Sequence, residues 1–191
     1  MRWFAALALA PVLYATVVLH PAIRMRDVGG VEREPLKVEK GGLKALFFIS
    51  RDCPISNRYS PEIRRICDEY SARGVACALV YVDPGLSDIE AAKHALDYGH
   101  GGYPKFVDRT HALVAATGAT VTPEAVLIRA DESIAYRGRI DNSYAALGKQ
   151  RSVVTERDLR DAIEAVLSGR AVARPEVAAI GCYIPDLAVM R

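Results

Sequence analysis

Apolar residues occur along the chain in two patterns, one typical of buried strands and one typical of amphipathic helices. Short continuous apolar runs that end at polar or turn residues indicate strands inside a sheet. Apolar residues three or four positions apart indicate helices with one buried face. The strands predicted in this way span residues 43–49, 75–82, 106–107, 124–129 and 134–139. The predicted helices run from just after residue 53 to about 73, from 87 to about 99, from 110 to 117 and from 155 to 168.

The order of these elements predicts an α/β fold. Two strands joined by a helix must run parallel with a right-handed crossover, which applies to residues 43–49 and 75–82. Residues 131–133 form a turn, so the strands on either side of it pair as an antiparallel hairpin. The expected architecture has three layers, with a mixed central sheet and helices on both of its faces.

Composition divides the chain into four segments. We expect an N-terminal signal sequence or membrane anchor at 1–22, a linker at 23–42, the folded domain at 43–170 and an irregular C-terminal tail at 171–191 that carries Cys182. The uncharged run at 3–19 reaches only the lower edge of the roughly 17–25 residues that a membrane-spanning helix needs. Pro11 disfavours cleavage at the small-residue site before it, so both interpretations of the first segment stay open. We predict an exported protein, in the periplasm or on the outer face of the cytoplasmic membrane, where an uncleaved segment would act as its membrane anchor.

Several polar side chains near the ends of predicted helices have structural interpretations. Asp52 is expected to cap the first helix. Thr155 and Asp158 resemble a capping box at the start of the last helix, with Asp where Glu or Gln is usual. His94 and His100 lie in or just after a helix, and we expect both on the surface.

Composition and charge exclude several classes of function. A chain of 191 residues that is 51% hydrophobic and 25% charged is an ordinary globular protein with room for one domain and some extensions. A net charge of +2, with no basic stripe, argues against a nucleic-acid partner. The four cysteines include no C-x-x-C pair, and none of the four histidines has ligand spacing from a cysteine. We therefore expect no bound metal and no cofactor.

The positions of the cysteines set Cys53 apart. Cys67 shares the apolar face of a predicted helix and Cys77 lies within an apolar strand, so we expect both to be small buried side chains without a redox role. Cys53 instead lies where a buried strand ends and a helix begins. Unpaired N–H groups and the helix dipole stabilise an anion at this place, and a thiolate held there has a lowered pKa. The sequence therefore predicts a nucleophilic thiol at Cys53.

The chain resembles the thioredoxin-like superfamily over roughly residues 36–169. Three features carry the resemblance, namely Cys53 at the helix N-terminus, Pro61 at the distance where thioredoxins often kink this helix, and Thr122-Pro123 directly before the hairpin. It is most similar to the redoxin or peroxiredoxin-type (alkyl hydroperoxide reductase/thiol-specific antioxidant) branch found in exported bacterial proteins. That similarity lies in three stretches: Asp-Cys-Pro-Ile-Ser-Asn at 52–57, Tyr-Arg-Gly-Arg-Ile-Asp at 136–141 and Gly-Cys-x-Ile at 181–184.

The sequence departs from both familiar motifs of this superfamily. Ser56 replaces the second cysteine of C-x-x-C, and a hydroxyl there can bond a thiolate but cannot resolve a mixed disulfide. In the peroxiredoxin motif P-x-x-x-T/S-x-x-C, Ser50 matches the hydroxyl position, but Leu46 stands in place of the proline.

The resemblance implies an exported thiol oxidoreductase in which Cys53 attacks a disulfide or a peroxide. Ser50 and Ser56 would stabilise the developing charge, and Pro123 would be a cis-proline whose backbone pairs with a substrate chain. Cys182 is a candidate resolving thiol, although an intermolecular bridge and a buried tail residue are the alternatives. The expected partners are a protein or small-molecule disulfide or peroxide and an external thiol reductant. This interpretation requires Cys53 not to be sealed in the core and Pro123 to be cis and close to it.

A second interpretation comes from a different class of protein. The domain would be a redox-inactive binding module that holds a partner chain in the groove beside Pro123. It predicts no unusual reactivity at Cys53.

Overall fold

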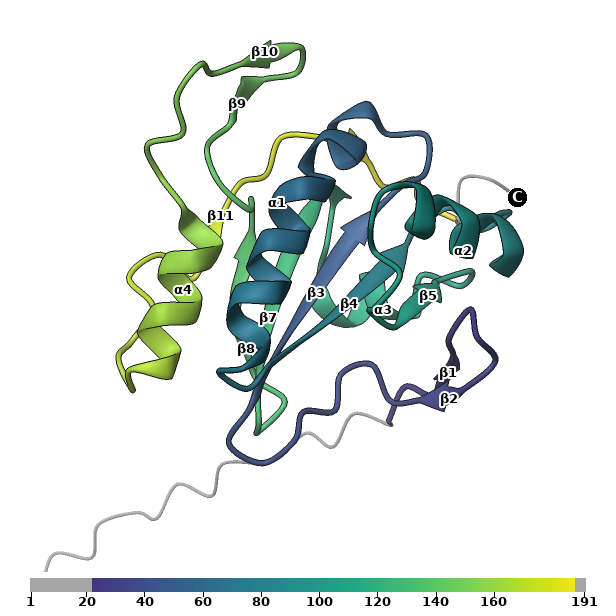
Figure 1. The fold of residues 1–191 in the computed structure, drawn as a ribbon, viewed down its shortest axis with the longest axis horizontal. Helices are drawn as coiled ribbons and strands as arrows, with labels where there is room; N and C mark the ends of the chain where they lie inside the picture. The colour runs from purple at the N-terminus through teal and green to yellow at the C-terminus, as the bar shows by residue number, and fades with distance from the viewer. Residues whose placement is uncertain (1–21, 188–191) are drawn as a thin grey trace, which may run out of the picture.

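A central six-stranded sheet organises the part of the chain that the computed structural model describes, residues 22–187 (Figure 1). Its strands are β3 (Leu43–Ile49), β4 (Val75–Tyr81), β5 (Lys105–Val107), β7 (Glu124–Arg129), β8 (Ile134–Gly138) and β11 (Glu176–Val177). They lie in the order β11-β8-β7-β3-β4-β5. β3, β4 and β5 are parallel, whereas β7 is antiparallel to both β3 and β8. The sheet is therefore mixed, as the sequence predicts.

Four helices cover this sheet. They are α1 (Pro54–Ser71), α2 (Asp88–Asp97), α3 (Ala112–Thr117) and α4 (Asp158–Leu167). Side chains of α1 and α4 pack with Phe47 and Ile49 of β3, whereas Leu113 of α3 packs with Phe48 on the opposite face. Successive side chains of a strand point to opposite faces, so the apolar run of β3 supplies both cores. Figure 1 shows α1 and α4 side by side in front of the sheet, with α3 behind it.

Three short antiparallel pairs lie outside the central sheet. β1 (Met25–Arg26) pairs with β2 (Glu32–Arg33), β9 (Tyr144–Ala146) pairs with β10 (Lys149–Gln150), and β6 (Val121–Thr122) pairs with β12 (Cys182–Tyr183). The expected linker thus contains a hairpin, whose turn is held by Asp27: its carboxylate accepts hydrogen bonds from the N–H groups of Gly29 and Val31 and from Arg33.

The C-terminal tail also differs from the expectation of an irregular segment. β11 joins the edge of the central sheet beside β8, and β12 pairs with β6. Both pairings require a glycine, because a Cβ on Gly138 or Gly181 would meet a backbone oxygen at 1.9 or 2.0 Å. Two-residue strands of this kind have too little periodicity to be found from sequence.

Cys67 and Cys77 form a disulfide that the sequence analysis missed. It joins α1 to β4, with 5.8 Å between the two Cα atoms. Both residues are buried, as expected, but their neighbouring positions across the helix–sheet interface depend on how α1 packs over β4. The expectation of two separate apolar side chains is corrected.

Other corrections concern local polar groups. The predicted capping box is absent, because the N-cap of α4 is Arg157, whose side chain makes no capping bond, and not Thr155. The Thr155 hydroxyl accepts a hydrogen bond from Asn142, and the Asp158 carboxylate binds Arg139 and Arg174. His94 and His100 are buried rather than on the surface. No helix within residues 22–187 has the length and hydrophobicity to cross a membrane, and the predicted signal or anchor falls almost entirely outside these residues.

Candidate functional site

Cys53 is the N-cap residue of α1. β3 ends at Ile49, a turn of the chain follows, and Pro54 occupies the first position of the helix, where a missing N–H costs nothing. The sulfur of Cys53 accepts a hydrogen bond from the N–H of Ser56, with 3.5 Å between the two atoms. The local sequence therefore aims the sulfur at the N-terminal end of the helix, as predicted.

The Thr122–Pro123 peptide bond lies directly beside this sulfur and is cis. The thiol of Cys53 donates a hydrogen bond to the carbonyl oxygen of Thr122, 3.2 Å away. The two segments meet because β3 and β7 are neighbours in the sheet, with Phe48 opposite Glu124.

The C-terminal tail brings Cys182 to the same place. Within the β6–β12 pair, Cys182 lies opposite Thr122. Gly181 allows this approach, since a Cβ there would lie 2.0 Å from the Thr122 oxygen. The Cys53 thiol bonds the carbonyl of that same Thr122, so the β6–β12 pairing brings the two cysteines together at one residue. Two cysteines that are 129 positions apart in the sequence thus become neighbours.

The two thiols have opposite shifts in acidity. Burial alone would raise the pKa of Cys53, but the neighbouring Cys182 thiol and the N–H and hydroxyl of Ser56 outweigh it, so the pKa of Cys53 is lowered. Burial and the neighbouring Cys53 raise the pKa of Cys182 to about 11. Near neutral pH, Cys53 is therefore the better nucleophile and the better leaving group of the pair.

Exposure also separates the two sulfurs. Cys53 is only 1% exposed, whereas Cys182 is exposed. Ile180, two residues before Cys182, packs against the core cluster that contains Cys53. The tail, drawn in yellow in Figure 1, passes the N-terminal end of α1. The expectation that Cys53 is not sealed in the core is therefore wrong for this structure: the residue belongs to a core cluster, against which the paired tail packs through Ile180.

The two predicted serines have different surroundings. The hydroxyl of Ser56 is buried, helps to lower the pKa of Cys53, and has no other hydrogen-bond partner within the described residues. Ser50 instead donates its hydroxyl hydrogen bond to Asp83, which also accepts from the N–H of Arg51. Ser50 therefore positions the loop before Cys53 and does not bond its sulfur.

Asp52 does not cap α1, because Cys53 occupies the capping position. The carboxylate of Asp52 is exposed and pairs with Arg51. A buried chain of hydrogen bonds was missed instead: His94 contacts the Tyr81 hydroxyl at 2.9 Å and the Asn57 side chain at 3.0 Å, and Asn57 donates to the Arg51 carbonyl. These groups hold the first turn of α1 against β4 and α2. Their spacing in the sequence gives no motif by which to find them.

Comparisons with known proteins agree with this architecture. The family model of Redoxin matches residues 21–152. A hypothetical protein from Sinorhizobium meliloti 1021 has 26% sequence identity and a TM-score of 0.70, and the match covers 85% of this chain and 89% of that one. An uncharacterized conserved protein from Geobacillus kaustophilus has 26% identity and a TM-score of 0.74, covering 87% and 89%.

More distant structures share the fold. A secreted Mycobacterium tuberculosis disulfide oxidoreductase, described as homologous to Escherichia coli DsbE, has 16% identity and a TM-score of 0.50, covering 59% of this chain and 80% of that one. No curated protein matches the chain.

Proposed function

Because the chain belongs to the Redoxin family, which supports a thiol-based redox function, we propose that Cys53 and Cys182 alternate between two thiols and one disulfide. The observation that carries this proposal is geometric: beside the cis bond at Pro123, Thr122 accepts the hydrogen bond of the Cys53 thiol and lies opposite Cys182 in the β6–β12 pair. The C-terminal tail thus supplies a second thiol, Cys182, which is missing at position 56 because that residue is a serine.

The reaction with a disulfide substrate has two exchange steps. The Cys53 thiolate attacks one substrate sulfur, which forms a mixed disulfide and expels the other half of the substrate as a thiolate. Cys182, after losing its proton, attacks the Cys53 sulfur and expels the remaining half. One substrate disulfide is reduced to two thiols, and a Cys53–Cys182 disulfide forms.

A peroxide would enter through the same thiolate. Cys53 would attack the peroxide oxygen, releasing an alcohol or water and leaving a sulfenic acid. The Cys182 thiol would then displace water and form the same disulfide. In both reactions an external thiol reductant restores the two thiols. The N–H and hydroxyl of Ser56 would stabilise the thiolate, and Ser50 would act through Asp83 as a positioning residue.

The test compares variants in thiol-dependent reduction of disulfides and of peroxide. Cys53→Ser is expected to abolish both reactions, because the remaining thiol, Cys182, has a raised pKa and no second cysteine with which to close the disulfide. Cys182→Ser is expected to complete only the first step and to accumulate a mixed disulfide or a sulfenic acid on Cys53, measured by mass spectrometry and dimedone trapping. Full activity in Cys53→Ser, or full turnover in Cys182→Ser, would refute the proposal.

We also propose that the protein is exported. A structural disulfide at Cys67–Cys77 is typical of oxidising compartments. The uncharged N-terminal run at 3–19 fits a signal sequence or anchor. A full-length fusion to alkaline phosphatase should be active, since that reporter folds only outside the cytoplasm, and a fusion lacking residues 1–22 should be inactive. Equal activity of the two fusions would exclude export by this segment. A carbonate wash of membranes then distinguishes the two forms, because it removes a cleaved, released domain and leaves an anchored one in the membrane.

The rival interpretation, a redox-inactive module for a partner chain, is disfavoured by the tail. Such a module would need the backbone edge of β6 beside Pro123 for its partner. β12 already pairs with that edge.

A further inference from the structure

A polar cavity of about 430 Å³ lies between α1 and the segment 141–157. Arg58, Glu62 and Arg65 line it from α1, and Asp141, Tyr144 and Arg157 line it from the facing segment. Its size is in the range of small-molecule sites. The redox pair does not require charged side chains at this place, and the packing of the core does not require them either.

The cavity lies next to the redox centre. A smaller space lined by Pro123 and Ile180 shares Tyr59, Asp141 and Tyr144 with it. Pro123 follows Thr122, whose carbonyl oxygen accepts a hydrogen bond from the Cys53 thiol. The cavity and the space beside Pro123 therefore have three lining side chains in common.

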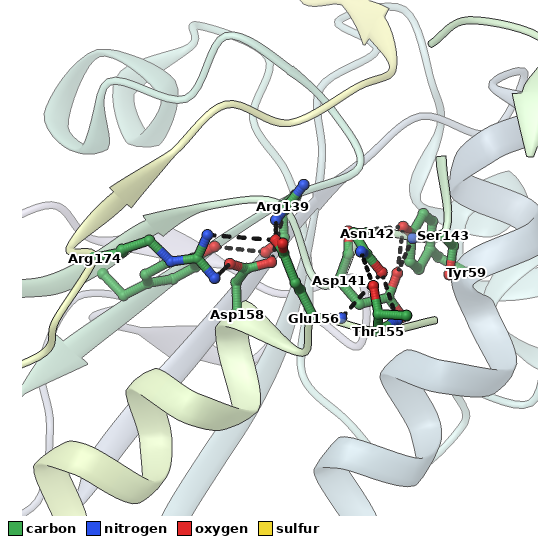
Figure 2. Close-up of polar contacts among 10 residues, drawn as sticks. Tyr59, Arg139, Asp141, Asn142, Ser143, Thr155, Glu156, Asp158 and Arg174 are labelled. Carbon is green, nitrogen blue, oxygen red and sulfur yellow. Dashed lines mark hydrogen bonds and ion pairs between the residues drawn. The ribbon is translucent and has the colours of Figure 1, made fainter. Parts of the chain in front are cut away.

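The acidic groups of the cavity are already bound within the protein. Glu62 accepts from Arg160 at 3.0 Å and from Arg65 at 2.7 Å. Asp141 accepts from the Tyr59 hydroxyl at 2.7 Å and from the N–H of Ser143 at 2.8 Å, and Figure 2 shows these three groups together. Glu62 is thus balanced by two arginines, whereas the donors to Asp141 are neutral, and within residues 22–187 neither carboxylate pairs with Arg58 or Arg157.

Arg58 and Arg157 are the cations left over. Within residues 22–187, neither guanidinium has a hydrogen bond or an ion pair. The wall that carries Arg157 is held in place, because the buried Asn142 side chain bonds the N–H groups of Thr155 and Glu156 (Figure 2). Two guanidiniums on opposite walls of one cavity form a site for carboxylates, which arginine binds through paired hydrogen bonds.

We propose that this cavity binds the carboxylates of a small disulfide substrate, or of the thiol derived from it, beside the Cys53–Cys182 pair. The inference rests on the proposed redox function and names its substrate class. A small molecule fits better than a polypeptide, because β12 already occupies the β6 edge with which an extended chain would pair. The covalent chemistry is the thiol–disulfide exchange described above. A bound disulfide is reduced to two thiols while Cys53 and Cys182 are oxidised to a disulfide, and in the reverse direction two bound thiols are oxidised while the two cysteines are reduced.

A binding measurement tests the cavity independently of turnover. The probe is S-methylglutathione, which carries two carboxylates and cannot exchange disulfides, titrated into the reduced full-length protein by calorimetry. Wild type should bind it saturably, and Arg58→Gln/Arg157→Gln should weaken binding by at least about tenfold, since hydrogen bonds to charged groups are lost. Arg64→Gln/Arg170→Gln removes the same charge from exposed positions outside the cavity and should change binding less than about twofold, which is within the usual range for surface substitutions.

Kinetics with two substrates then separate this inference from the proposed function. In Arg58→Gln/Arg157→Gln, kcat/KM should fall by about tenfold for glutathione disulfide and stay within about twofold for the uncharged bis(2-hydroxyethyl) disulfide. Absence of saturable binding in wild type, equal binding by the two double variants, or an equal loss for both disulfides would overturn the inference. Arginine-dependent binding without reduction of any disulfide would leave the cavity established and refute disulfide reduction as the function.

Discussion

The acidity of Cys53 is set by a few hydrogen-bond donors around one buried sulfur. Burial disfavours the thiolate, and the Cys182 thiol is the first of the groups that oppose this effect. Cys182 therefore influences Cys53 before any disulfide forms.

Replacing Cys182 with Ala is expected to raise the pKa of Cys53. With this donor gone, burial weighs more heavily against the thiolate, so less thiolate is present at neutral pH and reactivity begins at a higher pH. The pH dependence of alkylation by iodoacetamide measures this shift, with Cys53→Ser/Cys182→Ala as the blank. Superimposable pH profiles for wild type and Cys182→Ala would contradict the role assigned to this donor.

At the residue scale, Cys53 could be singled out from the sequence because it lies at the boundary of two strongly patterned elements, whereas the cis bond at Pro123 was expected from the resemblance to the thioredoxin-like superfamily. The sequence did not reveal Asp83 as the partner of Ser50, or the contacts of His94 with Asn57 and Tyr81. Those partners are fixed by the relative placement of separate elements, which hydrophobic periodicity does not encode.

Among the elements, the two-residue strand β12 has an effect out of proportion to its length. It pairs with β6 and places Cys182 opposite Thr122. Gly181 makes this possible, because a side chain there would collide with the Thr122 backbone.

A Gly181→Ala substitution is expected to slow formation of the Cys53–Cys182 disulfide. Its Cβ would lie 2.0 Å from the Thr122 oxygen, so β12 must move away and carry Cys182 with it. The rate of disulfide formation is measured by stopping the oxidation at successive times and mapping the peptides. Gly85→Ala is the matched control, since a Cβ there meets nothing within 4 Å and the rate should stay at the wild-type value. Equal rates for Gly181→Ala and wild type would show that β12 does not set the approach of the two sulfurs.

Periodicity predicted the long elements well. The strands at 43–49 and 124–129 match β3 and β7, and the four predicted helices are all present. It failed for the short strands, each two or three residues long, since such strands depend on turns and on an available edge. These are β1, β2, β6, β9, β10, β11 and β12.

On the scale of the whole molecule, the Cys67–Cys77 disulfide and the Cys53–Cys182 pair have separate tasks. The first ties α1 to β4, with both residues buried. The second lies at the opposite end of α1, where the tail covers it.

Removing the structural disulfide by Cys67→Ala/Cys77→Ala is expected to lower the free energy of unfolding by about 3 kcal/mol, because the unfolded chain is no longer constrained. Urea unfolding followed by circular dichroism measures this loss. Reduction of disulfides by the folded variant should remain at the wild-type rate, since neither sulfur touches the redox pair. Loss of turnover in the folded double variant would instead assign Cys67 and Cys77 a part in the chemistry.

The order of the cysteines in the sequence, with Cys182 after the other three, has a consequence for biosynthesis. As the polypeptide emerges, Cys53, Cys67 and Cys77 are all available before Cys182, which follows 105 residues after Cys77. If Cys53 formed a disulfide with Cys67 or Cys77 before Cys182 is available, the nascent protein would be trapped with the wrong disulfide. Cys67 and Cys77 are only 10 residues apart, and short loops close most readily. Early formation of the Cys67–Cys77 disulfide therefore leaves neither thiol free to react with Cys53. Cys53 then stays unpaired until Cys182 has been synthesised and β12 can pair with β6.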